Sequence, residues 1–110
     1  MKAVSFSNDV IIQQIIKSIV ELVNPDKIIL FGSHATGKAT KNSDYDICVL
    51  KKNANRKALT HKLYSIGLNA NAPVDMIVNT PSRFEKLKEY YSYVYYDIAK
   101  DGIVIYEKTK

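Results

Sequence analysis

Residues 27–50 read KIILFGSHATGKATKNSDYDICVL, and this stretch decides the fold. It contains two short apolar runs rich in β-branched residues, Lys27 to Phe31 and Tyr45 to Leu50, which predict two buried strands. Between them, Gly32 to Ser43 is loop-like, with room for a single helical turn around Ala35. This loop is too short for the crossover of about a dozen residues that parallel strands need. The two strands are therefore predicted to be antiparallel.

The remaining elements are predicted from hydrophobic periodicity and turn residues. Apolar residues at helical spacing predict helices over residues 8–23, 55–69 and 82–100, with Ser7 or Asn8 capping the first and Ser82 the last. Two further apolar runs predict strands over residues 73–78 and 103–106. The fold class is α/β (α+β): a small mixed sheet of three to four strands flanked by helices. Residues 1–110 are expected to form a single domain.

Composition narrows the class of protein and its partners. The chain is 46% hydrophobic and 25% charged, as a globular domain requires, and it has neither an apolar run of membrane-spanning length nor an apolar signal region. Its single cysteine, Cys48, allows no internal disulfide, which favours a cytoplasmic location. The net charge of +5 favours anionic partners such as nucleotides.

Two carboxylates begin the second predicted strand. Asp44 and Asp46 are two residues apart, so they project from the same face of the strand, about 6.5 Å apart along it. Tyr45, Ile47 and Val49 point to the other face, into a packed layer. Neighbouring like charges repel one another unless a cation joins them, and oxygen ligands suit Mg²⁺ or Mn²⁺. The alternative is structural, with Asp44 as a turn residue and Asp46 as an edge charge.

A third carboxylate, Asp75, interrupts the apolar strand predicted over residues 73–78, where a charge is costly to bury. If the strands are adjacent, Asp75 lies beside Asp44 and Asp46. Three such carboxylates can hold two metal ions about 4 Å apart for an in-line phosphoryl displacement.

Gly32 and Ser33 follow the first strand directly. Glycine lets the backbone approach an anion closely, so this turn is a candidate phosphate-binding site. Residues 32–38 also match the first seven positions of the P-loop, but Ala39 stands where the eighth position requires serine or threonine. The P-loop interpretation is therefore rejected. His34, in the same loop, is expected to be solvent-exposed.

One combination of motifs resembles the signature of the DNA-polymerase-β-like nucleotidyltransferase superfamily: Gly32-Ser33, ten intervening residues and then Asp44-Tyr45-Asp46. Residues 29–37 and 42–47 resemble its minimal nucleotidyltransferase (MNT) branch. The resemblance implies that Gly32 and Ser33 bind the nucleotide triphosphate, and that Asp44, Asp46 and Asp75 are the catalytic metal ligands. Many members carry a basic residue where Thr36 stands, and Lys38 or Lys41 are candidates to replace it.

Membership of the MNT branch implies a function as well. MNT proteins resemble the antitoxin half of HEPN/MNT toxin–antitoxin pairs, in which AMP is transferred from ATP to a tyrosine of the helical HEPN toxin. The chain is therefore expected to be a metal-dependent nucleotidyltransferase that uses ATP and Mg²⁺ or Mn²⁺. Two alternatives stay open: a catalytically silent module that neutralises its partner by contact, and a nucleic-acid-binding protein. The last ranks lowest because no aromatic–basic stacking motif is present.

Five of the eight tyrosines lie between Tyr90 and Tyr96. On one continuous helix, Tyr91 and Tyr95 would fall on the apolar face and pack in the core. Tyr93 and Tyr96 would fall roughly opposite, where exposed aromatic residues often mark a protein interface. These two residues are the candidate contacts to a partner toxin.

Overall fold

The computed structural model describes residues 9–70 and 72–109. Within them the chain forms a four-stranded sheet with the order β3-β2-β1-β4. Strand β1 pairs antiparallel with β2 and β4, whereas β2 and β3 are parallel, so the sheet is mixed, as predicted. The elements in chain order are α1 (Val10–Val23), β1 (Lys27–Phe31), α2 (Ser33–Thr36), β2 (Tyr45–Leu50), α3 (Arg56–Asn69), β3 (Val74–Asn79), α4 (Pro81–Leu87), α5 (Val94–Asp101) and β4 (Ile103–Glu107).

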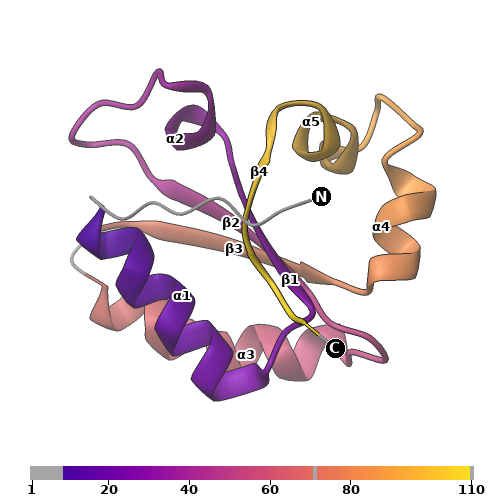
Figure 1. The fold of residues 1–110 in the computed structure, drawn as a ribbon, viewed down its shortest axis with the longest axis horizontal. Helices are drawn as coiled ribbons and strands as arrows, with labels where there is room; N and C mark the ends of the chain where they lie inside the picture. Colours follow the sequence, from indigo (N-terminus) through magenta and orange to yellow (C-terminus); the bar gives the residue numbers. More distant parts are fainter. Residues whose placement is uncertain (1–8, 71, 110) are drawn as a thin grey trace.

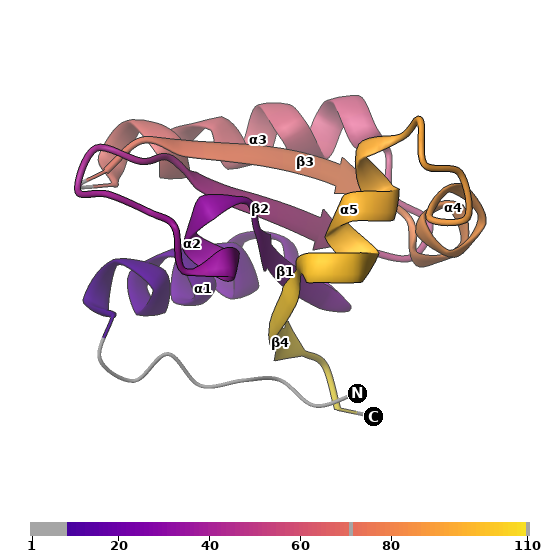
Figure 2. The same ribbon diagram turned by 90° about the horizontal axis from the view of Figure 1, so that it is seen from above.

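Helices cover both faces of the sheet (Figures 1 and 2). Helices α1 and α3 pack on one face, where Ile12, Ile47 and Leu63 belong to the larger buried cluster. Helices α4 and α5 pack on the other face over a smaller cluster that includes Cys48 and Ile98. Because side chains alternate along a strand, Tyr45, Ile47 and Val49 of β2 face α1 and α3, as expected. The face beneath α4 and α5 is the one that receives Asp46.

Helix α1 begins and ends at well-defined caps. The side chain of Asp9 accepts a hydrogen bond from the backbone N–H of Ile12 at 3.0 Å, so Asp9 is the N-cap. The predicted caps, Ser7 and Asn8, are therefore wrong, and both lie outside the described residues. At the other end Asn24 adopts a left-handed conformation with φ of 49°, and Pro25 follows it.

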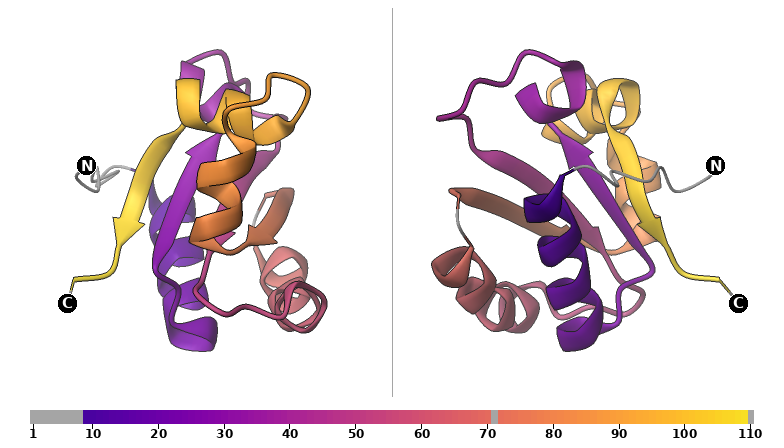
Figure 3. Two further views of the ribbon diagram at one scale, coloured as in Figure 1. Left: turned by 90° about the vertical axis from the view of Figure 1, so that its right-hand side faces the viewer. Right: turned by 60° about the vertical axis from the view of Figure 1, so that its left-hand side comes forward.

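The single helix predicted over residues 82–100 is instead two helices, α4 and α5. Thr80, not Ser82, caps α4, and Pro81 occupies its first turn. The chain then turns through residues 88–93, with short-range bonds from Tyr90 N to Leu87 O and from Tyr93 N to Tyr90 O. Figure 3 shows the two short helices at an angle to one another.

The break has a packing reason. Phe84 of α4 and Tyr95 of α5 meet edge to face, with ring centroids 5.9 Å apart, and both are buried in the smaller cluster. One straight helix of this length would extend about 28 Å and carry its second half past the sheet. Tyr91 consequently lies in the turn and is 85% exposed, so the prediction that it packs in the core is wrong. Tyr95 is buried, as predicted, while Tyr93 and Tyr96 are exposed.

The β1–α2–β2 segment matches the prediction closely. A single helical turn, α2, follows β1, and the antiparallel β1–β2 pairing rules out the P-loop, which must lead into a parallel strand.

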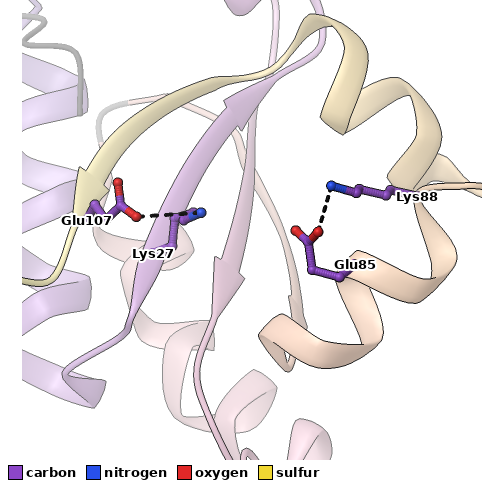
Figure 4. Close-up of polar contacts among 4 residues, drawn as sticks. All are labelled: Lys27, Glu85, Lys88 and Glu107. Atoms are coloured by element: carbon purple, nitrogen blue, oxygen red, sulfur yellow. Dashed lines mark ion pairs between the residues drawn. The ribbon is translucent and has the colours of Figure 1, made fainter. Parts of the chain in front are cut away.

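Two surface ion pairs flank the sheet: Lys27–Glu107 at 3.7 Å between β1 and β4, and Glu85–Lys88 at 2.6 Å at the end of α4 (Figure 4). Ion pairs at the protein surface contribute little stability. None of the described helices has the length and apolar character of a membrane span.

Candidate active site

The strand register brings two of the predicted carboxylates side by side. Asp46 of β2 is the direct Cα partner of Asp75 of β3, and neighbouring strands lie about 4.8 Å apart. Both side chains leave the sheet on the face of Cys48 and Ile77, which is the face covered by α4 and α5. Asp44 precedes β2 on the same side. The three predicted residues therefore gather at one margin of one face of the sheet.

The exposure of the carboxylates differs from the burial of Asp75 that the sequence suggested. Asp75 is exposed because β3 is the last strand of the sheet, so its charge is not buried among apolar neighbours. Asp44 is also exposed, and Asp46 is half-buried between β1 and β3. The cost of carrying these charges therefore comes from their mutual proximity as well as from burial.

The pKa values of Asp46 and Asp75 are both raised. The pKa of Asp46 is raised, first by partial burial and then by the negative charges of Asp75 and Asp44, while His34 opposes the shift. The pKa of Asp75 is also raised, by partial loss of water and then by a hydrogen bond to Asp44 and its charge. A divalent cation would relieve this repulsion, so the chemistry of the donor set fits Mg²⁺ or Mn²⁺. As the side chains of residues 9–70 and 72–109 stand, however, no three His, Cys, Asp or Glu groups converge on one point that an ion could occupy.

This repulsion predicts a pH-dependent effect of Asp46→Asn on stability. Because the folded-state pKa of Asp46 lies above the ordinary value near 3.9, the folded chain binds more protons than the unfolded chain between these two pKa values. The contribution of the Asp46 carboxyl to the free energy of unfolding is therefore largest below the ordinary pKa. This contribution is lost as the pH rises through the folded-state pKa. Asp46→Asn should therefore raise the melting temperature at pH 7 in chelating buffer. The gain should shrink toward zero below about pH 3.9, and thermal unfolding at both pH values is the check; an equal gain at both would contradict the electrostatic cause.

Gly32 lies directly against the carboxylate of Asp46. Its backbone has φ of 74° and ψ of −155°, a region that essentially only glycine occupies. A Cβ atom there would also overlap the carboxylate of Asp46. The absence of a side chain thus lets the turn after β1 approach Asp46, and it places Ser33 at the start of α2 beside the same margin of the sheet.

Gly32→Ala should therefore destabilise the fold by about 2–4 kcal/mol, combining backbone strain with overpacking. Gly37→Ala is a matched control, because Gly37 also has positive φ, 80°, but a methyl group added there would meet no atom of the described residues within 4 Å. That control should lose only about 1 kcal/mol, the strain contribution alone. Chemical denaturation of both variants measures the difference, and equal losses would show that the contact with Asp46 is unimportant.

His34 has a role that sequence reasoning missed. It was expected to be solvent-exposed, but it is half-buried and stacks on Tyr45 with ring centroids 3.8 Å apart. Its Nε2 donates to the carbonyl of Ser43 at 3.3 Å, and the Tyr45 hydroxyl donates to Asp9 at 3.2 Å. These contacts tie the loop to α1 and hold the residue before Asp44 in place. An aromatic residue between two aspartates is the sequence signal that could have suggested a stacking partner.

Basic side chains around the turn are exposed. Thr36 lies at the end of α2, where its hydroxyl approaches the carbonyl of Ser33 at 3.5 Å. Lys38 and Lys41, the candidates to replace a basic residue at Thr36, lie on the exposed part of the loop. Cys48 is fully buried and burial raises the pKa of its thiol to about 12, which makes it a structural residue.

A glycine–serine turn beside a row of strand carboxylates is the arrangement of a nucleotidyltransferase. The family model described as "Polymerase beta, Nucleotidyltransferase" matches residues 13–110. The chain therefore belongs to the polymerase-β nucleotidyltransferase family, and the predicted resemblance is confirmed. No curated protein matches the chain.

Solved structures agree on the fold. A toxin–antitoxin crystallised with AMP-PNP is 26% identical, with a TM-score of 0.58 over 88% of this chain and 73% of that chain. A putative nucleotidyltransferase from Sulfolobus solfataricus is 18% identical, with a TM-score of 0.61 over 89% and 78%. A mutant of the toxin–antitoxin MntA-HpeT is 24% identical, with a TM-score of 0.56 over 88% and 73%. These likenesses show that the chain shares its fold with these proteins.

Proposed function

We propose that this chain is a metal-dependent nucleotidyltransferase that transfers AMP from ATP to a tyrosine hydroxyl of a partner toxin, and so acts as an antitoxin. The observation that carries the proposal is the register that sets Asp46 beside Asp75, with Asp44 adjacent and the Gly32 turn in contact. Family membership and the toxin–antitoxin crystallised with AMP-PNP support it. We also propose that residues 1–110 act as one nucleotidyltransferase domain.

The proposed reaction assigns a role to each residue. Gly32 and Ser33 hold the triphosphate, because the turn combines close backbone approach with a hydroxyl donor. Asp44, Asp46 and Asp75 would hold the metal ions, which supply charge stabilisation at the α-phosphate when bound. The acceptor oxygen forms a bond to the α-phosphorus as the bond to the β-phosphate oxygen breaks, and pyrophosphate leaves with the electron pair. Asp75, whose pKa is raised, accepts the hydroxyl proton.

The partner surface is proposed from the exposed tyrosines. Tyr90, Tyr91, Tyr93 and Tyr96 are exposed by 55%, 85%, 48% and 39%, and they lie on α5 and the turn before it. Tyrosine is enriched in interfaces because it buries a large area and keeps a polar tip. We propose that Tyr93 and Tyr96 contact a helical HEPN toxin. Helix α5 packs on the sheet face from which Asp46 and Asp75 project (Figure 3).

The second candidate function is a binding module that silences its partner by contact alone. Two observations favour it: the exposed aromatic surface, and the carboxylates that do not converge as they stand among the described residues. Asp44 and Asp75 are exposed and can rotate, and nucleotide phosphates supply further metal ligands, so the enzyme remains the better proposal.

ATP binding should depend on a divalent cation. With Mg²⁺ present, titration calorimetry should detect ATP binding, because the cation offsets repulsion between the three carboxylates and the triphosphate. With excess chelator the affinity should fall by at least about tenfold, the equivalent of roughly 1.4 kcal/mol. Equal affinity under both conditions would contradict the two-metal site.

A further inference from the structure

Strand β3 has one hydrogen-bonded edge and one open edge. The carbonyls of Pro73 and Asn79 accept bonds from β2, from Tyr45 N at 2.9 Å and Lys51 N at 3.1 Å. Because peptide groups alternate in direction along a strand, those of Val74, Met76 and Val78 point away from β2. The carbonyl of Val78 confirms this direction, since it accepts a bond from Arg56 Nε at 3.1 Å.

Val74 and Met76 therefore present backbone donors and acceptors along the sheet margin, and no other strand within residues 9–70 and 72–109 pairs with that edge. Figure 2 shows β3 as the outermost strand on this side, with α3 alongside it. An open edge of this kind selects one form of ligand, an extended backbone that completes the ladder.

The surface beside this edge is hollowed and apolar. A pocket of about 340 Å³ lies between β3 and α3, and Val74, Asp75 and Met76 line its strand side. On the helix side it is lined by Tyr64 and Leu68, each 67% exposed. Side chains of an added strand that point toward α3 would cover these two residues.

The far end of the edge is basic. A second pocket of about 520 Å³ shares Thr60, Met76 and Val78 with the first and extends to Arg56, Lys57 and His61. None of the described residues that line it is acidic. Charge complementarity therefore favours acidic side chains at the end of a ligand that lies near Val78.

We infer that the open edge of β3 binds an extended segment of the acceptor protein as an added antiparallel strand, with the acceptor tyrosine opposite Asp75. This inference rests on the proposed function. Asp75 lies in a non-hydrogen-bonded position toward the new strand, where opposite Cα atoms are about 4.5 Å apart and side chains share a face. The tyrosine would thus project onto the carboxylate face, while its two neighbours bond to Val74 and Met76 and enter the α3 pocket.

The arrangement also defines the preferred sequence of the segment. In an antiparallel pair, the residue opposite Val78 lies three positions before the tyrosine, close to Arg56 and Lys57. The segment should therefore have acidic residues three and four positions before the tyrosine, and apolar residues on each side of it. These features make the acceptor recognisable by sequence.

The test uses a synthetic peptide of this design: two glutamates, one threonine, then tyrosine between two valines. The full chain, labelled with ¹⁵N and free of nucleotide and metal, is followed by amide hydrogen exchange. Saturating peptide should slow exchange at Val74 and Met76 by about tenfold or more, because their amides gain backbone partners. The matched control peptide carries N-methyl groups on both valines, which removes the donors that face β3, and it should leave exchange unchanged.

Two variants and a control complete the test. Met76→Pro removes an outward N–H without breaking a bond to β2, and proline is tolerated on an open strand edge. Leu68→Glu places a charge in the α3 pocket at an exposed position, so it stays informative if the proline variant does not fold. Each should weaken peptide binding about tenfold or more, equivalent to the loss of roughly one hydrogen bond or apolar contact. Val10→Glu, at a residue 60% exposed on α1, should have no effect.

The outcomes separate docking from catalysis. No slowing at Val74 and Met76, slowing confined to other strands or helices, or equal binding of the N-methylated peptide would overturn the docking inference. Peptide docking with no transfer of AMP to any partner would overturn the proposed function and leave the docking site standing. Transfer to the partner that is undiminished by Met76→Pro and Leu68→Glu would overturn the docking site alone.

Discussion

Asp46→Asn should abolish nucleotidyl transfer while the chain stays folded. The substitution removes a negative charge with little change in side-chain volume, at the residue that faces Asp75 across the strand pair. If the metal that stabilises the α-phosphate loses a carboxylate ligand, the barrier should rise by about 4 kcal/mol or more, a loss on the order of a thousandfold in rate. The measurement is transfer of labelled AMP to a candidate partner toxin.

The matched control for this substitution is Glu21→Gln. Glu21 is exposed on α1, outside the carboxylate cluster and the proposed partner surface, so removing its charge should leave the rate of transfer within about twofold, as is usual for surface substitutions. If Asp44→Asn and Asp46→Asn are combined and full transfer remains, the assignment of these residues to catalysis is wrong.

Asp75→Asn should distinguish the enzyme from the binding module. If the chain transfers AMP, this variant should lose transfer by a comparable factor, because both a metal ligand and the proton acceptor are removed. Binding to the partner should remain, since Asp75 is exposed and its loss leaves the core intact. A pull-down and an activity assay on the same preparation measure both properties.

The binding module makes the opposite prediction. Asp75→Asn would then leave inhibition of the partner unchanged, and alanine at Tyr93 and Tyr96 would be the damaging change, costing about 2 kcal/mol or more each if they are central to the interface. Leu22→Ala, which removes an apolar side chain that is 38% exposed on α1, is the control for general loss of an exposed large side chain. Partner binding that is equally weakened at all three positions would argue against a specific aromatic surface.

The fold could be predicted largely because its signals are local. Both central strands match the structure residue for residue, Lys27–Phe31 and Tyr45–Leu50, since dense β-branched runs bounded by turn residues leave few alternatives. Loop length alone decided their antiparallel pairing. The order of the sheet and the parallel β2–β3 register were not predicted, because they depend on long-range packing that a single sequence does not encode locally.

The last helix shows where local reasoning failed. Apolar residues at helical spacing run through residues 84–98, yet the chain turns at residues 88–93 so that Phe84 and Tyr95 meet over the sheet. The stabilisation from that tertiary contact outweighs the stabilisation from continuing one helix through these residues. The resulting turn moves Tyr91 from the expected core to the surface. Helix propensity is a weak prior that tertiary packing routinely overrides.

The site was predictable in its residues but not in its geometry. Asp44 and Asp46 share a face because strand periodicity is fixed, whereas the pairing of Asp46 with Asp75 required the register of β3. The contact between Gly32 and Asp46, and the stacking of His34 on Tyr45, bring together residues from different elements. No spacing rule predicts such contacts, although the glycine and the aromatic residue were visible in the sequence.

Intact-mass spectrometry of the partner tests the central claim most directly. The chain is co-expressed with a candidate HEPN partner, and the partner is weighed with and without ATP and Mg²⁺. The account predicts that the partner gains the mass of one or more AMP groups on a tyrosine, and that Asp46→Asn prevents the gain while the two proteins still bind. A partner that the chain inhibits fully, yet never modifies, would contradict the enzymatic account.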